Sequence, residues 1–161
     1  MKAMIIYHDF ASASKANAAL QYAVQHANTG TPWDIRPYRT ELLKFPPTAE
    51  EVLAEARDAH LVVLAGRNAE SLPVWLQHWL EQWAKTRWIE NAALAVIYAG
   101  NADPLSPSAN PGLSAFANRH GLDFIFGENL AIAPSAMADR SPVAENNLHE
   151  PGRPATRLAR Q

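Results

Sequence analysis

Two side chains that can move protons near neutral pH stand next to each other after the first apolar segment. His8 and Asp9 follow the run from Lys2 to Tyr7. An imidazole titrates near physiological pH, so the pair could act as a general acid or base. Adjacent residues of an extended chain point to opposite sides, however, so the two side chains need not cooperate. The sequence therefore leaves the catalytic residues unassigned.

Other patterns of catalytic and metal-binding residues are missing from the chain. His60, His78 and His120 are scattered, and no two histidines have a ligand spacing such as His-x-x-x-His. Cysteine is absent, so the sequence predicts no metal site. Ser12 and Ser14 lack the Gly-x-Ser-x-Gly elbow of hydrolases, and the phosphate-binding motif of nucleotide hydrolases is also absent.

The composition is that of one globular domain. The chain has 161 residues, of which 48% are apolar and 19% charged, with a formal net charge of −2. This balance gives no reason to expect a nucleic-acid or membrane partner, and no apolar run approaches the roughly 20 residues of a membrane span. Met1 and Lys2 lead into a strand-like segment, too short for a signal peptide, so we expect a cytoplasmic protein.

A strand, a loop and a returning helix organise the middle of the chain. His60–Ala65 is a continuous apolar run, and a largely polar loop, Gly66–Ser71, follows it. From Pro73 to about Lys85, apolar residues recur at helical spacing. A strand followed by an amphipathic helix is half of a β–α–β unit, which predicts a parallel sheet. Ligands of such sheets sit beyond the carboxyl ends of the strands, so we expect the functional site at Gly66–Ser71.

The remaining segments repeat this alternation of strands and helices. Further strands are predicted at Lys2–Tyr7, Trp33–Tyr38 and Ala92–Ala99 and within Asp123–Ala133. Further helices are predicted at Lys15–Ala27 with Ser14 as N-cap, after a capping box at Thr48–Glu51, and from Pro111. Right-handed crossovers then predict an α/β fold, a three-layer, doubly wound sheet of five parallel strands in the order 2-1-3-4-5. Pro37 places the second strand at an edge of the sheet.

The chain divides into a regular and an irregular part. Residues 1–133 contain every predicted strand and helix and form one domain. Residues 134–161 contain four prolines, which leave no room for a long regular element. We predict an irregular, proline-rich tail there, and a last helix that is short or absent.

The order and lengths of these elements resemble the flavodoxin-like fold, and especially the group of NADPH-dependent FMN reductases and quinone reductases. The resemblance covers about residues 1–133 and is carried by three loops. Ser12–Asn17 is similar to the turn rich in serine and threonine that holds the FMN phosphate. Pro73 and Leu76 match the helix start after the third strand, and Gly100–Asp103 resembles a Gly-x-Gly-Asp segment.

The resemblance implies an FMN-binding redox protein that passes electrons or hydride to a small acceptor, as an NAD(P)H-dependent flavin oxidoreductase does. The residues implied for the phosphate are Ser12, Ser14, Lys15 and Asn17. The residues implied for one side of the ring are Gly66, Arg67 and Asn68, and those for its edge are Gly100, Asn101 and Asp103.

A second hypothesis follows from two departures from the family pattern. The phosphate turn lacks the glycine that lets a backbone wrap closely around a phosphate. Asn68 stands where the family has the aromatic residue that covers the flavin. A flavodoxin-like domain that has lost its flavin and acts as a binding or assembly module would show both departures. The sequence leaves the two hypotheses open.

Tryptophan recurs at every fourth residue of the long helix. Trp75, Trp79 and Trp83 run parallel to a row of leucines, which makes the apolar stripe wider than one sheet face needs. We predict that the tryptophans form the interface of a homodimer. The alternative is that they pack in the core against Trp88 and neighbouring helices. A platform for a flat ligand is less expected, because this face lies away from the strand ends.

Overall fold

The computed structural model describes residues 1–27, 30–66, 72–98 and 111–126, and within them it contains one parallel five-stranded sheet in the order β2-β1-β3-β4-β5. The strands are β1 (Lys2–Tyr7), β2 (Asp34–Arg39), β3 (Leu61–Gly66), β4 (Ala93–Tyr98) and β5 (Asp123–Phe126). The helices are α1 (Phe10–Ala27), α2 (Pro46–Ala56), α3 (Val74–Thr86), α4 (Pro111–Arg119) and the 3-10 helix η1 (Thr40–Lys44). This confirms the predicted α/β architecture, which has the strand order of the flavodoxin-like fold.

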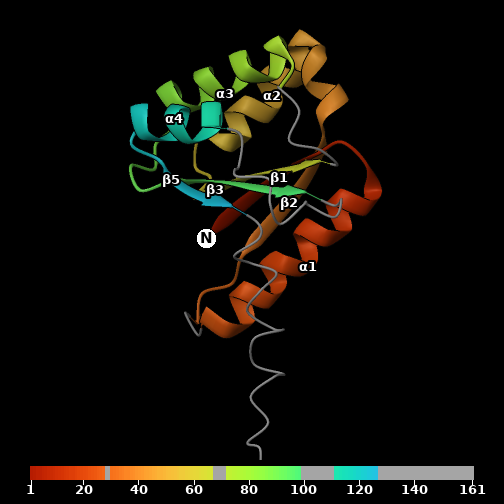
Figure 1. The fold of residues 1–161 in the computed structure, drawn as a ribbon, viewed down its shortest axis with the longest axis vertical. Coiled ribbons are helices and arrows are strands. Elements are labelled where there is room, and N and C mark those ends of the chain that lie inside the picture. The colour runs from red at the N-terminus through yellow and green to blue at the C-terminus, as the bar shows by residue number, and fades with distance from the viewer. Residues whose placement is uncertain (28–29, 67–71, 99–110, 127–161) are drawn as a thin grey trace, which may run out of the picture.

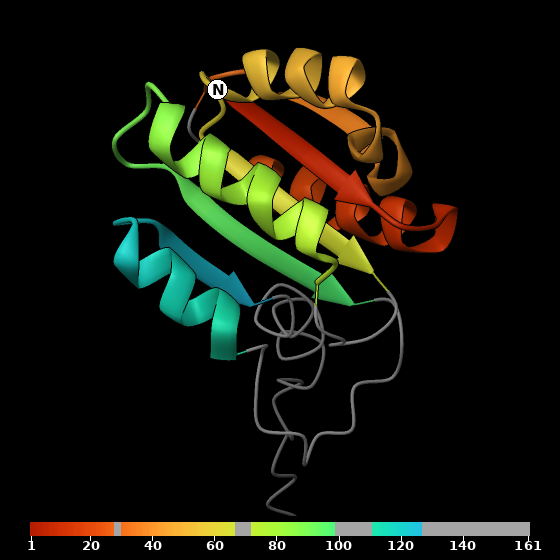
Figure 2. The same ribbon diagram turned by 90° about the horizontal axis from the view of Figure 1, so that it is seen from above.

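The helices cover both faces of the sheet. Figures 1 and 2 show α2, α3 and α4 side by side over one face, and Figure 1 shows α1 beneath the other. Side chains of a strand alternate between these faces, so Met4 and Ile6 join the core under α2–α4, while Ala3 and Ile5 join the core against α1. The two apolar cores hold the three layers together.

The strands differ in burial according to their place in the sheet. β3 lies in the middle, and every residue from Leu61 to Ala65 is buried. Among the described strands, β2 pairs only with β1, and it contains Pro37, which confirms the predicted edge position. Register matches Tyr7 with Ala65, and Gly66 with Tyr98, so the carboxyl ends of β1, β3 and β4 meet at one edge. The site described below lies at this edge.

Two helices begin earlier than the sequence indicated. α1 starts at Phe10, because Asp9 caps it: the backbone N–H of Ser12 donates to Asp9 Oδ1 at 2.8 Å. Ser14 is therefore inside the helix and is not its N-cap. α2 starts at Pro46, with Phe45 as N-cap, so the predicted capping box Thr48–Glu51 lies within the helix.

The tryptophan row of α3 is mostly core. Trp79 and Trp83 are 2% and 0% exposed, and their ring N–H groups donate to the α2 carbonyls of Ala49 (3.2 Å) and Ala56 (2.9 Å). The premise that these side chains form an exposed interface is wrong, and the alternative of a core role is confirmed for both. Trp88 does not join them, because it is 70% exposed.

Three expectations fall on residues 127–161, which lie outside the described residues. They are the domain boundary after residue 133, the irregular tail over residues 134–161 and the short or absent last helix. They stay predictions.

Candidate functional site

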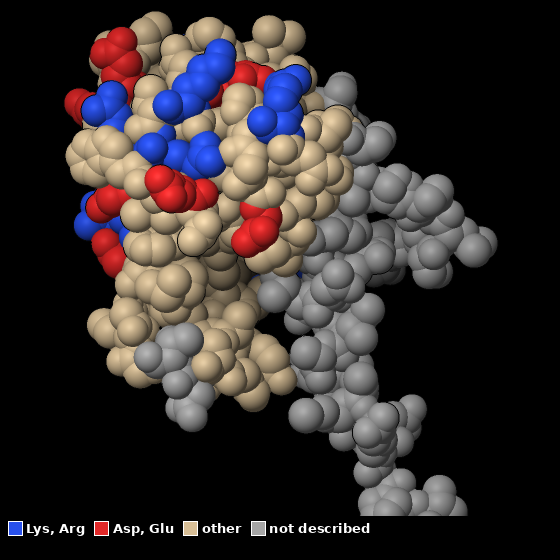
Figure 3. Space-filling model, turned by 90° about the vertical axis from the view of Figure 1, so that its left-hand side faces the viewer, with Lys and Arg blue, Asp and Glu red and all other residues tan. Residues whose placement is uncertain are grey.

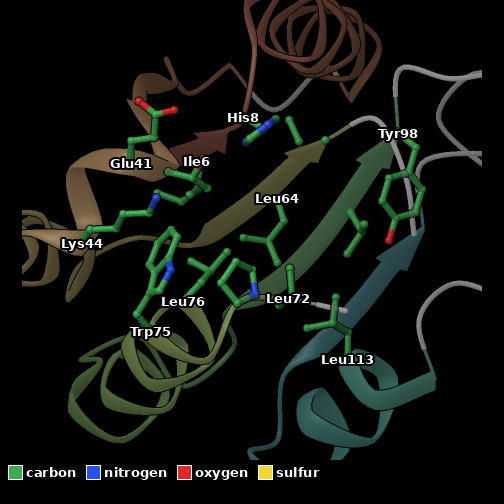
Figure 4. A pocket seen from close by; sticks show the side chains of 15 residues that line it. Ile6, His8, Glu41, Lys44, Leu64, Leu72, Trp75, Leu76, Tyr98 and Leu113 are labelled. Atoms are coloured by element: carbon green, nitrogen blue, oxygen red, sulfur yellow. The ribbon is translucent and has the colours of Figure 1, made fainter. Parts of the chain in front are cut away.

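A pocket of about 400 Å³ opens at the carboxyl end of the sheet, on the face that carries α3 and α4 (Figure 4). Small-molecule sites in proteins usually measure roughly 300–1,000 Å³, so this pocket can hold a ligand of one or two rings. Its described lining is Ile6, His8, Thr40, Glu41, Lys44, Leu64, Ala65, Gly66, Leu72, Pro73, Trp75, Leu76, Val96, Tyr98 and Leu113.

Two rows of strand residues form the floor of the pocket. The inner row consists of Ile6, Leu64 and Val96, which are register partners on β1, β3 and β4 and belong to the same core. In the outer row, Gly66 is the register partner of Tyr98. Because Gly66 carries no side chain, the outer row is open beside Tyr98. The inner part of the floor is therefore apolar, and the floor has more room at Gly66, at the carboxyl ends of the strands.

The mouth of the pocket carries charge on the side of η1. The ammonium of Lys44 lies 5.6 Å from the centre of the Trp75 ring, a distance typical of a cation–π contact. The carboxylate of Glu41 pairs with Arg39 at 3.6 Å. Figure 4 shows that the Glu41 carboxylate points away from the pocket, while the Lys44 side chain extends toward Ile6. The charge presented to the pocket at this side is therefore positive.

His8 and Asp9 have separate roles in the structure. The side chain of His8 lines the pocket, and its backbone N–H donates to the carbonyl of Ala65 at 3.0 Å. The carboxylate of Asp9 instead accepts from Ser12 at the start of α1. The two side chains thus serve different elements, and their adjacency in the sequence does not create a catalytic pair.

Tyr98 supplies a phenol at the far side of the pocket from Lys44 (Figure 4). Burial raises the pKa of Tyr98 above its ordinary value of 10.0. The hydroxyl therefore keeps its proton at neutral pH. It can both donate and accept a hydrogen bond.

The residues predicted to hold a phosphate are spread over the first turns of α1. Ser12 is 0% exposed, and its hydroxyl donates to Asp9 Oδ1 at 2.9 Å. Ser14 and Asn17 are exposed on the helix. Lys15 Nζ donates to the carbonyl of Tyr98 at 2.6 Å, so this ammonium lies at the carboxyl end of β4. Of the four residues predicted to hold the phosphate, Lys15 is therefore the one that reaches a strand end, that of β4.

The start of α1 does not fit an FMN phosphate. The carboxylate of Asp9 already accepts from the backbone N–H and the hydroxyl of Ser12, which are groups that a phosphate would need. A phosphate at this place would also meet the negative charge of Asp9, which repels it.

Of the residues predicted around the flavin ring, Gly66 is in the pocket lining. The remaining ones, Arg67, Asn68, Gly100, Asn101 and Asp103, lie outside the described residues.

The sequence did not point to the η1 side of the pocket. Thr40–Lys44 carries no periodic pattern, and it reaches the site because β2 ends beside β1. The position of Trp75 corrects an expectation, since the sequence made a ligand platform on this helix less expected than an interface or core role. Trp75 stands in the first turn of α3, which starts at the strand ends and so brings the ring to the pocket.

A second hollow lies between α3 and α4, and its lining includes Gln77, Glu81 and Arg119. Glu81 forms ion pairs with Arg119 and with Lys85 (3.9 Å), and it lies 3.0 Å from His120 Nε2. Figure 3, which views the molecule from the left-hand side of Figure 1, shows charged side chains of both signs in its upper half. The Glu81 carboxylate is thus used in contacts within α3 and with the end of α4, so the hollow offers no free carboxylate at this position.

The part of the chain that the structure describes contains no group of three potential metal ligands among His, Cys, Asp and Glu. None of the helices within the described ranges combines the length and apolar character needed to cross a membrane.

No protein-family model matches the chain, and no curated protein matches it. Among solved structures, the chain is similar to the crystal structure of the flavodoxin-like domain of a protein from Synechococcus sp.. The two share 15% sequence identity with a TM-score of 0.46, and the likeness covers 76% of each chain. At this level the likeness says nothing of a ligand, which has to be argued from the pocket.

Proposed function

We propose that this chain is a binding module of flavodoxin-like fold that holds a flat, largely apolar small molecule in the strand-end pocket. The observation that carries the proposal is the pocket itself: an apolar floor at the carboxyl ends of three parallel strands, open at Gly66. Ligands of open parallel sheets bind at this edge. The ring of Trp75 at the mouth adds an aromatic surface on which a flat molecule can pack.

FMN-dependent transfer of electrons or hydride to a small acceptor is the second candidate. It is favoured by the pocket's place at the strand ends and by Lys15, whose ammonium lies at the end of β4. The start of α1 does not fit the phosphate, as described above, so this candidate requires a flavin held without that cradle. An NAD(P)H-dependent flavin oxidoreductase would be the corresponding enzyme.

A paired titration separates the two candidates. FMN and riboflavin carry the same ring, and only FMN carries a phosphate. Under the leading proposal, riboflavin or another neutral flat ring also binds, and FMN binds less than about tenfold more tightly. Under the second candidate, FMN binds with a dissociation constant of about 1 μM or tighter and riboflavin at least about tenfold more weakly. Flavin fluorescence gives both constants.

The variant Lys15→Ala sharpens this comparison. If Lys15 contacts a phosphate, the variant loses affinity for FMN and not for riboflavin, because the ring is unchanged. A charge-assisted contact of this kind contributes about 1.5–3 kcal/mol. Equal affinities of wild type and variant for both flavins would reject the second candidate's use of Lys15.

A further inference from the structure

Lys44 differs from the other lysines that the structure places. Among the described residues, no carboxylate lies within ion-pair distance of its ammonium, whose recorded contact is the ring of Trp75. The other lysines all have a polar partner: Lys2 with Asp58 (2.7 Å), Lys15 with the Tyr98 carbonyl (2.6 Å) and Lys85 with Glu81 (3.9 Å). The pocket is therefore lined by an ammonium whose charge the described side chains leave unneutralised.

The nearest acidic side chain on the same element does not cancel this charge. Glu41 also lines the pocket, but its carboxylate pairs with Arg39 and points outward (Figure 4). Lys44 and Trp75 thus present a cation and an aromatic face side by side, from η1 and from α3. A ligand that uses both must combine a flat ring with a negative group near it.

We infer that the strand-end pocket selects flat aromatic ligands that carry an anionic substituent, with Lys44 binding the anion and the ring lying in the apolar pocket beside Trp75. This inference rests on the proposed function, since it names the class of ligand for the same pocket. The resemblance to flavodoxin-like proteins predicted an anion-binding group at the start of α1, where Asp9 caps the helix. The group inferred here is Lys44 of η1, which lines the pocket.

A purely structural role of Lys44 is the competing explanation. The contact with Trp75 joins η1 to α3 and would stabilise the fold modestly. That role predicts that Lys44→Met lowers the thermal midpoint and leaves the choice between charged and neutral ligands unchanged. The two explanations therefore differ in ligand selectivity.

Two fluorescent probes test the selectivity directly. Anilinonaphthalene sulfonate and phenylnaphthylamine share one aromatic skeleton, and only the first carries a sulfonate. We expect wild type to bind both and to prefer the sulfonate. Lys44→Met should weaken the sulfonate about fivefold or more and change the neutral probe less than about twofold, because an exposed cation contributes a modest charge-assisted contact. Lys44→Arg should retain most of the preference.

Lys85→Met is the matched control, because it removes one lysine charge from α3 outside the pocket lining. It should leave the affinities for both probes unchanged. The preference of wild type for the sulfonate should also fall as salt is raised, since salt screens an exposed charge.

The outcomes distinguish this inference from the function on which it rests. If the neutral probe binds and Lys44→Met weakens both probes equally or neither, the pocket is a binding site and the inference about anions is wrong. If neither probe binds to wild type, both the proposed function and this inference are wrong. A loss confined to the sulfonate in Lys44→Met, absent from Lys85→Met, supports both.

Discussion

Gly66 decides how much room the pocket has. It stands beside Tyr98 in the outer floor row, and no described atom lies within 4 Å of the place where a Cβ would be added. Leu64, two residues earlier, faces the core under α3, so a side chain at position 66 would point to the same side. The pocket therefore depends on the absence of one side chain, and a larger residue can fill it without moving the backbone.

We predict that Gly66→Leu blocks the site and leaves the fold intact. The leucine side chain would occupy the open part of the floor, so affinity for the neutral naphthylamine should fall about tenfold or more. The midpoint of thermal unfolding should change little, because the added side chain meets open space. Gly66→Ala serves as the graded control and should have a smaller effect. Unchanged affinity in Gly66→Leu would place the ligand elsewhere.

At the scale of the elements, α2 and α3 are joined by two indole groups. Trp79 and Trp83 fill the core between the helices, and each also donates its ring N–H to a carbonyl of α2. Ala56 is the last residue of α2, and its carbonyl accepts from the N–H of Ala59 just after the helix (3.1 Å) as well as from Trp83. The indole of Trp83 therefore combines apolar burial with the capping of a helix end.

We predict that Trp83→Phe lowers the free energy of unfolding by about 2 kcal/mol. The change removes the buried indole hydrogen bond to the Ala56 carbonyl, which keeps the Ala59 N–H as donor, and opens a small cavity. Urea unfolding measures the loss. Trp88→Phe is the control, because Trp88 is 70% exposed and should change stability by less than about 0.5 kcal/mol. Equal effects of the two variants would contradict the core role of Trp83.

A carboxylate, Glu55 of α2, connects this helix to the edge strand β2, so the connection depends on pH. The hydroxyl of Tyr38 donates to Glu55, which also pairs with Arg36 at 3.1 Å. The Tyr38 hydrogen bond, and then Arg36, lower the pKa of Glu55 below its ordinary value of 4.5, against the opposing effect of burial. A carboxylate with a lowered pKa stabilises the fold above its unfolded pKa, and this stabilisation is lost as pH falls through the folded pKa.

We predict that wild type is more stable than Glu55→Gln near neutral pH and that the difference shrinks below about pH 4.5. The difference should not exceed about 1 kcal/mol, because the Glu55 side chain is 41% exposed and solvent screens its partners. Urea unfolding of both proteins at several pH values measures it. A difference that stays constant into acid would show that the ionised carboxylate contributes nothing.

At the scale of the whole molecule, the burial of the tryptophans changes what can be expected of assembly. The homodimer predicted from the sequence stays a prediction, but Trp79 and Trp83 lie inside one chain and give it no support. Charged side chains gather over the layer of α2–α4 in Figure 3, whereas Phe10–Ala27 contains a single Lys and no Asp, Glu or Arg. The layer of α2–α4 therefore carries more charged side chains than α1 does.

We predict that Trp79→Asp unfolds the chain and does not simply separate two subunits, because it places an unpaired charge in the core. The variant should lose the cooperative thermal transition seen by circular dichroism. Val74→Asp, on the exposed first turn of the same helix, should keep that transition. A folded, monomeric Trp79→Asp variant beside a dimeric wild type in sedimentation would restore the interface hypothesis.

The sequence by itself determined the architecture of the described residues. Continuous apolar runs such as His60–Ala65 and helical stripes such as Leu72–Trp83 report local periodicity, and the rules of connection convert their order into the sheet order. Pro37 marked the edge strand for an equally local reason, because proline cannot complete a sheet ladder. The strand-end location of the pocket agrees with the same rules, and among the described residues predicted around a cofactor ring Gly66 is in its lining.

Tertiary structure alone decided which side chains meet at the site. Asp9 caps α1 through a local contact with Ser12, and its carboxylate competes with any external anion for the first N–H groups of the helix. The same chain geometry buried Trp79 and Trp83 against α2 and left Trp75 at the pocket, although all three share one sequence spacing. Lys44 and Trp75 are far apart in the sequence, and their contact exists because η1 and α3 pack together. Periodicity identifies the face of an element, whereas the neighbour of that face depends on packing between distant segments.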